Sequence, residues 1–313
     1  MAKLLFGSQP SLAETSWAQL VETWQAMDET RWHSLWTYDH FVPAGPGADI
    51  TKDCFEGWTA LAGAALVTHR IRIGCLVTGN TYRNPVLVAK MAATIDHMSN
   101  GRLDVGLGAS WHVPEHEVYG WDFPSMKERQ DRLEEATHLI RLLFDADEPV
   151  NFQGKYYQLK DAPFAPKCLQ KPHAPIVIGG GGEKRTLRTL AKYGDVMNVF
   201  GTPETVRHKI EVFEQHCARV GRDPSEIRKT VTLSMVLVED PARRQQFLQV
   251  AASRLRRSVE EIGGELPIGD ADHIARILNR YVELGISEVI SQGIPNDPRL
   301  YEKISNELIS RFE

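Results

Sequence analysis

The 313-residue sequence has few cysteines, no long hydrophobic run and no strong excess of one charge. Its four cysteines (Cys54, Cys75, Cys168 and Cys217) lie far apart without C-x-x-C spacing, which argues against a disulfide framework or a zinc knuckle. No window approaches the run of about 18 apolar residues that crosses a membrane. The net charge of −5 provides no general attraction for nucleic acid or anionic lipid. We therefore expect a cytoplasmic protein that binds neither, and that holds any anionic ligand at a local site.

Strand and helix patterns alternate along the chain, with no linker and no internal repeat. Alternation of this kind favours a parallel sheet, and the number of strands favours a closed barrel over an open, doubly wound sheet. We therefore predict an α/β fold, a single (β/α)8 TIM barrel that spans residues 1–313. Its eight strands are expected at residues 3–6, 33–38, 71–77, 103–107, 176–178, 195–200, 230–238 and 287–293.

Two segments do not fit this alternation, and we expect both to be insertions in loops that follow strands. Residues 113–124 look irregular, and residues 149–160 alternate around Gln153-Gly154 in the manner of a β-hairpin. Two helical stretches, residues 58–67 and 89–93, are rich in small residues. Small residues allow helices to approach closely, either within the fold or across the two-fold axis of a homodimer.

Polar or glycine-bearing segments follow several of the expected strands. They are Asp39-His40, the stretch from Cys75 to Thr78, the stretch from Ala109 to His112 and the run from Gly179 to Gly182. Parallel strands present their carboxyl ends on one side of a barrel, where α/β enzymes carry their sites. We therefore expect these four segments to surround one pocket.

The glycine run at residues 179–182 has the pattern of an anion-binding site. It joins an apolar strand to a helix expected from Glu183, so its backbone N–H groups stand at a helix N-terminus. Lys184, Arg185 and Arg188 add positive charge. The run is neither a Walker A loop nor a G-x-G-x-x-G turn. We predict that it binds the phosphate of a cofactor; the alternative is a flexible turn.

His40 is the candidate for proton transfer, because imidazole titrates near neutral pH. The alternative is a hydrogen-bonded structural histidine. His112-Val113-Pro114-Glu115-His116 matches the H-x-x-E-H letters of a zinc-peptidase motif. That motif needs both histidines on one helical face, and Pro114 disfavours the helical conformation at Val113. We therefore expect no metal site, and we interpret Cys75 as structural or cofactor-lining because no general base is assigned to it.

Taken in order, these segments resemble the luciferase-like monooxygenase superfamily, specifically its branch of oxidoreductases that use the deazaflavin coenzyme F420. The resemblance is strong over about residues 1–200 and weak beyond. It implies a TIM barrel with an insertion, a cofactor ring in the mouth of the barrel and a non-proline cis peptide, here expected at Cys75–Leu76. The matching stretches are Leu35–Phe41, Ile73–Pro85, Asp96–His112, Glu115–Gly120, Gly154–Tyr157, Ile178–Gly182 and Tyr193–Asp195.

The resemblance also implies site residues. His40 matches the histidine near the hydride-transferring carbon and would be the catalytic residue. Trp111 stands where sugar-phosphate dehydrogenases of this branch carry an acidic base, which favours a flatter or more apolar substrate bordered by Trp111, Arg83 and His112. The cofactor-binding residues would be Asp39, His40, Cys75, Leu76, Thr78, Ala109, Ser110, His112, Gly179, Gly180, Gly181, Gly182, Glu183 and Lys184.

The expected activity is hydride transfer between F420 and a small organic substrate that the sequence does not identify. One alternative is an FMN-dependent monooxygenase on the same barrel, in which reduced flavin activates oxygen. The other is a non-catalytic flavin- or deazaflavin-binding barrel, against which Asp39-His40 argues. The basic residues near the glycine run do not decide between the cofactors, because either the flavin phosphate or the acidic deazaflavin tail would be neutralised there.

Overall fold

The computed structural model describes residues 4–45 and 47–313, so Lys3, at the start of the expected first strand, lies outside the described residues. Eight parallel strands close into a barrel in the order β1-β12-β9-β8-β7-β4-β3-β2. The predicted (β/α)8 barrel is confirmed. The barrel strands are β1 (Leu5–Gln9), β2 (Ser34–Thr37), β3 (Arg72–Gly79), β4 (Leu103–Gly108), β7 (Ile176–Gly179), β8 (Val196–Phe200), β9 (Arg228–Ser234) and β12 (Glu288–Gln292).

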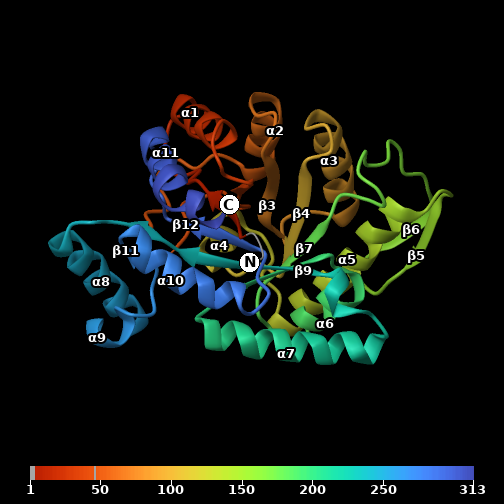
Figure 1. Cartoon of the computed structure of the whole chain (residues 1–313). Helices are drawn as coiled ribbons and strands as arrows, with labels where there is room; N and C mark the ends of the chain where they lie inside the picture. The colour runs from red at the N-terminus through yellow and green to blue at the C-terminus, as the bar shows by residue number, and fades with distance from the viewer. Residues whose placement is uncertain (1–3, 46) are drawn as a thin grey trace.

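Helices surround this barrel and alternate with its strands (Figure 1). Two small sheets lie outside it: β5 (Val150–Gln153) pairs antiparallel with β6 (Gln158–Ala162), and β10 (Val236–Leu237) pairs with β11 (Ile268–Gly269). The α-helices are α1 (Trp17–Asp28), α2 (Gly57–Val67), α3 (Pro85–Met98), α4 (Val113–Tyr119), α5 (Met126–Asp145), α6 (Thr186–Tyr193), α7 (Pro203–Val220), α8 (Pro241–Leu255), α9 (Val259–Ile262), α10 (Ala271–Val282) and α11 (Pro298–Glu307).

Several helices begin at a side chain that accepts a hydrogen bond from the first turn, which explains where the loops end. Ser16 caps α1, Asn84 caps α3 just before Pro85, and Thr202 caps α7 just before Pro203. Proline suits this first turn because it has no N–H to leave unpaired. Helix α6 differs, since no side chain caps its N-terminus. In its first turn the Leu187 backbone N–H donates instead to the Gly182 carbonyl at 3.0 Å.

The alternation of side chains along each strand divides the core into two layers. One face of the strands packs against the surrounding helices in a large apolar cluster. The other face fills the inside of the barrel with Trp36, Leu76, Val177, Val196 and Ile290. Because residues i and i+1 of a strand point into different layers, register decides which of them can reach a ligand.

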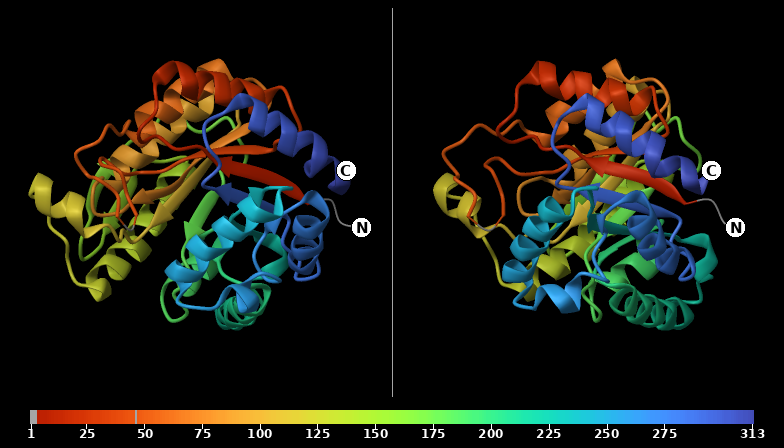
Figure 2. Two further views of the ribbon diagram at one scale, coloured as in Figure 1. Left: turned by 90° about the vertical axis from the view of Figure 1, so that its left-hand side faces the viewer. Right: turned by 60° about the vertical axis from the view of Figure 1, so that its left-hand side comes forward.

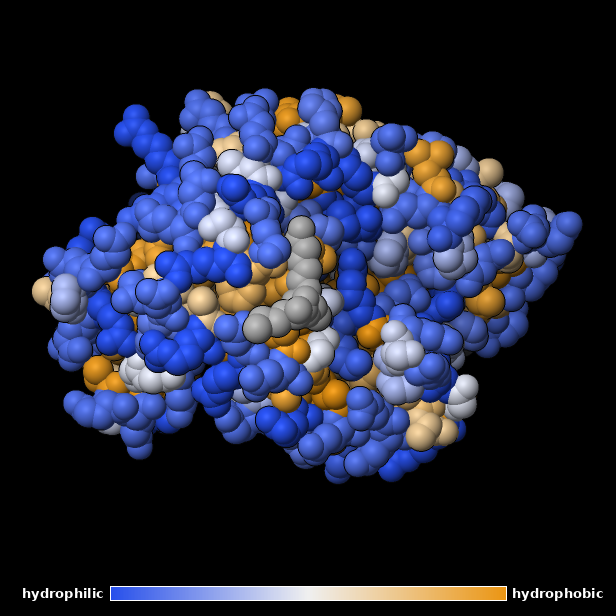
Figure 3. Space-filling model, viewed as in Figure 1, coloured by the Kyte–Doolittle hydropathy of each residue, from blue (hydrophilic) through white to orange (hydrophobic). Residues whose placement is uncertain are grey.

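The small residues of α2 and α3 are used within the fold. Ala64 on α2 and Ala89, Ala92 and Ala93 on α3 are completely buried. They let the helices approach each other and the barrel, so their side chains are not available to a second copy of the chain. On the face drawn in Figure 3, hydrophobic residues lie in small areas between hydrophilic ones. Among the described residues, no helix is both long and apolar enough to cross a membrane.

The segment that follows β4 departs from the expectation of an irregular loop. Residues 113–119 form α4, which Figure 2 shows at the end of the barrel away from the termini. Pro114 occupies the first turn of this helix, where proline is tolerated. Val113 is thus helical, although Pro114 was expected to disfavour that conformation there. Strand β3 also runs on to Gly79, beyond the break expected at Thr78.

Candidate active site

A pocket of about 1310 Å³ lies where the carboxyl ends of the barrel strands meet. Many of the predicted site residues line it: Asp39, His40, Leu76, Ala109, Ser110, Trp111 and the run from Gly179 to Lys184. The pocket also reaches Gln9 and Gln292 at the ends of β1 and β12, and Asn198 within β8. Segments that are far apart in sequence thus share one cavity, as a parallel barrel requires.

Four predicted site residues do not line this pocket: Cys75, Thr78, Arg83 and His112. Cys75 is fully buried in the layer between barrel and helices, because its neighbour Leu76 points into the barrel. Burial raises the pKa of the Cys75 thiol, which keeps it protonated and unreactive. The Thr78 hydroxyl accepts a hydrogen bond from Trp58 Nε1 at 3.1 Å, so it serves the attachment of α2.

Arg83 holds the loop after β2 in place instead of bordering the substrate space. Its Nε and Nη2 donate to the two carboxylate oxygens of Asp39 at 3.0 and 2.6 Å, and Nη2 also contacts Glu56. The backbone N–H of Gly79 donates to Asp39 at 3.0 Å. Burial raises the pKa of Asp39, although Arg83 and this N–H oppose the shift. Arg83 does not line the pocket and its guanidinium is used by two carboxylates of the fold, which does not favour the predicted role beside the substrate.

Strand β3 carries an irregularity where the pocket begins. Pairing with β4 is regular up to Cys75 and resumes at Thr78, so Leu76 and Val77 form the bulge. The non-proline cis peptide is Leu76–Val77 and not Cys75–Leu76 as expected, because the regular ladder includes Cys75. Gln9 Nε2 donates to the Leu76 carbonyl at 2.6 Å. The bulge is therefore held from inside the barrel.

Three glycines make room for the Val77 side chain on the neighbouring strands. A Cβ at Gly108 or Gly179 would lie 2.4 or 2.6 Å from a methyl carbon of Val77, and one at Gly106 would lie 2.0 Å from the Cys75 carbonyl. These distances are far below ordinary contact. The glycines of β4 and β7 therefore reflect the space that the bulge occupies, in addition to any role in ligand binding.

The glycine run leads from β7 to α6 along the pocket. Gly180 has φ of 113°, a conformation that side-chain-bearing residues rarely adopt. Helix α6 begins at Thr186, later than the Glu183 start that was expected, and Arg185 pairs with Asp131 of α5. Lys209 of α7 lies against Gly181 and pairs with Glu183 at 2.5 Å. Lys184 is exposed and makes no ion pair within the described part of the chain, so its charge is available to a ligand.

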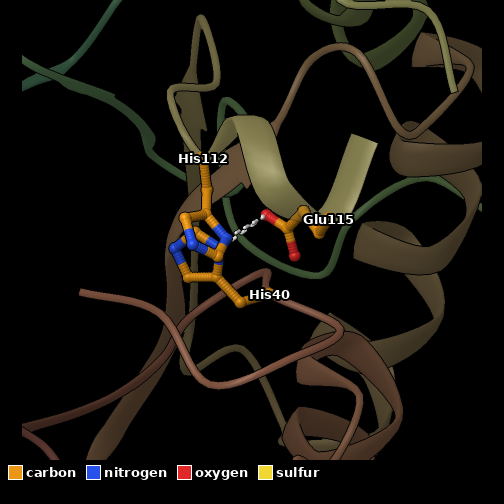
Figure 4. A group of neighbouring side chains, drawn as sticks. All are labelled: His40, His112 and Glu115. Atoms are coloured by element: carbon orange, nitrogen blue, oxygen red, sulfur yellow. Dashed lines mark hydrogen bonds and ion pairs between the residues drawn. The ribbon is translucent and has the colours of Figure 1, made fainter. Parts of the chain in front are cut away.

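The side chain of His40 contacts a buried carboxylate (Figure 4). His40 Nδ1 lies 2.7 Å from Oε1 of Glu115, which is fully buried. The Tyr82 hydroxyl also donates to Oε1, and the Phe41 backbone N–H donates to Oε2 at 2.9 Å. Burial alone raises the pKa of Glu115, but these three hydrogen bonds outweigh it and bring the pKa below its usual value. The carboxylate is therefore ionised.

His112 approaches the same carboxylate without bonding to it. Its Nδ1 lies 3.4 Å from Glu115 Oε1, is buried and has no hydrogen-bond partner among the described residues. Burial lowers the pKa of His112 against the opposing charge of Glu115, so the ring is neutral. Figure 4 shows both imidazoles on the same side of Glu115. His112 thus packs against His40, with ring centroids 5.3 Å apart.

Ligand atoms of His40, His112 and Glu115 lie within 4.8 Å of one another, a spacing that would suit a metal ion. Both oxygens of Glu115, however, already accept hydrogen bonds. The zinc-peptidase geometry is not formed either, because His116 Nδ1 lies 2.7 Å from the His112 carbonyl and Nε2 lies 2.7 Å from Thr81 Oγ1. We therefore interpret the cluster as a hydrogen-bonding network.

Sequence reasoning missed the polar residues Gln9, Asn198 and Gln292. Each stands at or near the end of a barrel strand, which is the signal that located Asp39 and His40. In the sequence, Glu115 stands out only as the glutamate of the H-x-x-E-H pattern. For Tyr82 no sequence signal exists, because its partner Glu115 is 33 residues away and meets it only through the fold.

Comparison with known proteins agrees with this geometry. The family model described as luciferase-like monooxygenase matches residues 3–256. The chain belongs to this family. Within it, the chain is 35% identical over 193 residues to the F420-dependent glucose-6-phosphate dehydrogenase of Amycolatopsis mediterranei, a match that covers 61% of this chain and 54% of the relative. The chain thus spans about half the length of that relative.

Other relatives match along nearly the whole chain. The F420-dependent glucose-6-phosphate dehydrogenase of Segniliparus rotundus is 26% identical over 336 residues, which covers 98% of this chain and 97% of the relative. A solved F420-dependent secondary alcohol dehydrogenase in complex with an F420-acetone adduct superposes with a TM-score of 0.81 at 22% identity, over 98% of both chains. At that identity the structural likeness establishes the family fold alone.

Proposed function

We propose that this chain is an oxidoreductase that transfers a hydride between coenzyme F420 and a small organic substrate. The observation that carries the proposal is the division of one pocket into two chemical sides. The glycine run follows β7, which stands across the closed barrel from β1, and His40 follows β2, the neighbour of β1. An anion-binding side thus faces a proton-transferring side. The F420-dependent relatives support this assignment.

The glycine side suits the acidic tail of the deazaflavin. No side chain caps the N-terminus of α6, and anions are stabilised at such a terminus. Lys184 adds a charge that has no ion-pair partner in residues 4–45 and 47–313, whereas Lys209 is shared with Glu183. We propose Gly179, Gly180, Gly181, Gly182, Glu183 and Lys184 as the residues that hold the tail.

The bulge and His40 suit the ring end. Leu76 and Val77 present an apolar surface held by Gln9, and Ala109 and Ser110 line the pocket beside it. When bound there, the deazaflavin supplies the hydride-carrying chemistry. The residues of this chain orient the ring, exclude water and handle the proton that accompanies the hydride. We assign that proton to His40.

The substrate is proposed to be a neutral molecule. Of the charged residues that line the pocket, Lys184, Arg185 and Lys209 belong to the glycine side, whereas the loops after β1 and β2 contribute the carboxylates Glu14 and Asp39. The Trp111 ring lies 5.3 Å from the His40 ring and is largely exposed. An aromatic wall without a cation favours a neutral alcohol or carbonyl compound over a sugar phosphate.

Equilibrium titration tests the cofactor assignment. Purified protein is titrated with F420 and separately with FMN, and binding is followed by the change in cofactor fluorescence. The proposal predicts that F420 binds and that FMN binds more weakly or not at all. Binding of FMN alone would instead support a flavin-dependent monooxygenase, whose cofactor also has an anionic end. Failure of both to bind would refute a cofactor-binding pocket.

We also propose that the chain forms a homodimer in the cytoplasm. Since the alanines of α2 and α3 are buried, an interface on these helices would use their exposed apolar residues, Leu66 and Leu87. Sedimentation equilibrium of the wild type and of a Leu66→Lys/Leu87→Lys variant tests this. A dimer that the variant dissociates supports the surface, whereas a monomeric wild type contradicts the dimer.

A further inference from the structure

We propose that Glu115 is a positioning residue for His40: its buried carboxylate fixes the imidazole with the proton on Nδ1 and leaves Nε2 for the substrate. The assignment of the tautomer follows from the hydrogen bonds that the ionised Glu115 carboxylate accepts. Its consequence for turnover rests on the proposed function.

The hydrogen bonds around Glu115 require a hydrogen on Nδ1 of His40. Because the carboxylate is ionised, it can only accept, and every group that contacts it must donate. The Phe41 backbone N–H always donates, and burial followed by the hydrogen bond to Glu115 raises the pKa of Tyr82, which keeps that hydroxyl protonated. His40 Nδ1, at 2.7 Å from Oε1, must therefore carry a hydrogen.

The surrounding structure keeps Glu115 in this position. Its helix, α4, begins at the end of the β4 loop, and its two oxygens are held by groups from the loops that follow β2 and β3. His112 is the remaining candidate to compete for the carboxylate, but it stays at 3.4 Å and is neutral. His40 therefore has a single strong partner, and its Nε2 has none among the described residues.

This arrangement suits proton transfer on the pocket side. When an alcohol is oxidised, its C–H bond breaks and the electron pair leaves as hydride to the deazaflavin, which is the oxidant. The O–H bond on the oxygen attached to that carbon also breaks, its electron pair forms the C=O bond, and Nε2 of His40 takes the proton. The Nδ1–H group of His40 remains hydrogen-bonded to Glu115, whose negative charge stabilises the imidazolium. In the reverse direction, imidazolium Nε2–H donates the proton to the carbonyl oxygen.

Replacement of Glu115 by glutamine tests this positioning role, because the neighbouring backbone N–H fixes the orientation of the new amide group. The Phe41 N–H can only donate, so the amide oxygen of Glu115→Gln must face it. The amide NH2 then faces His40 Nδ1 and donates to it, which moves the imidazole proton to Nε2. Glu117→Gln is the matched control, since Glu117 lies on the same helix and is exposed.

The first readout is nitrogen NMR of histidine-labelled protein without cofactor, with the His40 signals assigned by their loss in a His40→Gln variant. We expect the Nδ1–H tautomer in the wild type and in Glu117→Gln, and the Nε2–H tautomer in Glu115→Gln. An Nε2–H wild type, or a Glu115→Gln variant with unchanged tautomer, overturns the proposal. If Glu115→Gln does not fold, the tautomer of His40 in the wild type alone tests the proposal.

The second readout is turnover with F420. Glu115→Gln is expected to lose roughly 10²- to 10⁴-fold in kcat, the usual worth of a positioned acid or base, with unchanged affinity for F420. Full kcat in a variant whose tautomer has changed overturns the link to catalysis. A wild type that turns over no substrate with F420 refutes the proposed function, while the tautomer measurement still stands.

Discussion

Replacement of Arg83 by methionine tests whether this residue is structural. The side chain of Asp39 is inaccessible to solvent and takes two hydrogen bonds from Arg83, at 2.6 and 3.0 Å. Removing one partner of a buried ion pair leaves an uncompensated charge, which costs about 3–5 kcal/mol. This is a large share of the roughly 5–15 kcal/mol that stabilises a typical domain. Urea unfolding at neutral pH measures the loss.

Two further variants show whether the buried charge is the cause. Adding Asp39→Asn to Arg83→Met removes the unpaired charge and should recover most of the lost stability. Arg132→Met is the control: Arg132 contacts Glu128 at 2.7 Å on the partly exposed face of α5, so its loss should cost less than about 1 kcal/mol. Because burial raises the pKa of Asp39, the penalty in Arg83→Met should also shrink as the pH is lowered.

The reasoning is refuted if Arg83→Met unfolds within about 1 kcal/mol of the wild type, the range of exposed ion pairs. It is equally refuted if the double variant is no more stable than the single one. A stable Arg83→Met protein with weakened substrate binding would restore the substrate role that the sequence predicted.

Three other perturbations have defined outcomes. Gly179→Ala puts a Cβ 2.6 Å from Val77, so urea unfolding should show a loss of about 1–3 kcal/mol that Val77→Ala partly recovers. Burial lowers the pKa of His173, but the hydrogen bond and charge of Asp195 outweigh burial and raise the pKa above 6.5. The unfolding free energy should therefore fall as the pH rises through the raised pKa. A His173→Gln variant should lack this pH dependence. Lys184→Met should weaken F420 binding roughly tenfold, or about 1.4 kcal/mol, in the fluorescence titration.

The sequence contains enough information for the barrel because local patterns and topology agree. Apolar strands alternate with capped helices, and eight such units can close only in a limited number of ways. The segment after β4 was predicted less well. A short helix such as α4 has too few residues for a clear period, and Pro114 reads as a breaker unless the helix start is already known.

The candidate site was located from sequence, but the direction of its side chains was not. Residues near strand ends were expected around one pocket, and His40, Trp111 and the glycine run do line it. Which of Cys75 and Leu76 faces the pocket depends on strand register. The partners of Arg83 and Glu115 depend on contacts between distant loops, which no local pattern encodes.

The most direct test of the central claim is deazaflavin-dependent turnover of neutral alcohols and carbonyl compounds, with isopropanol and acetone as first probes and glucose-6-phosphate as the charged comparison. The account predicts hydride transfer by the wild type and by Glu117→Gln, and a loss of roughly 10²- to 10⁴-fold in His40→Ala with F420 affinity retained. Unchanged turnover in His40→Ala, or turnover that requires FMN and oxygen, would contradict it.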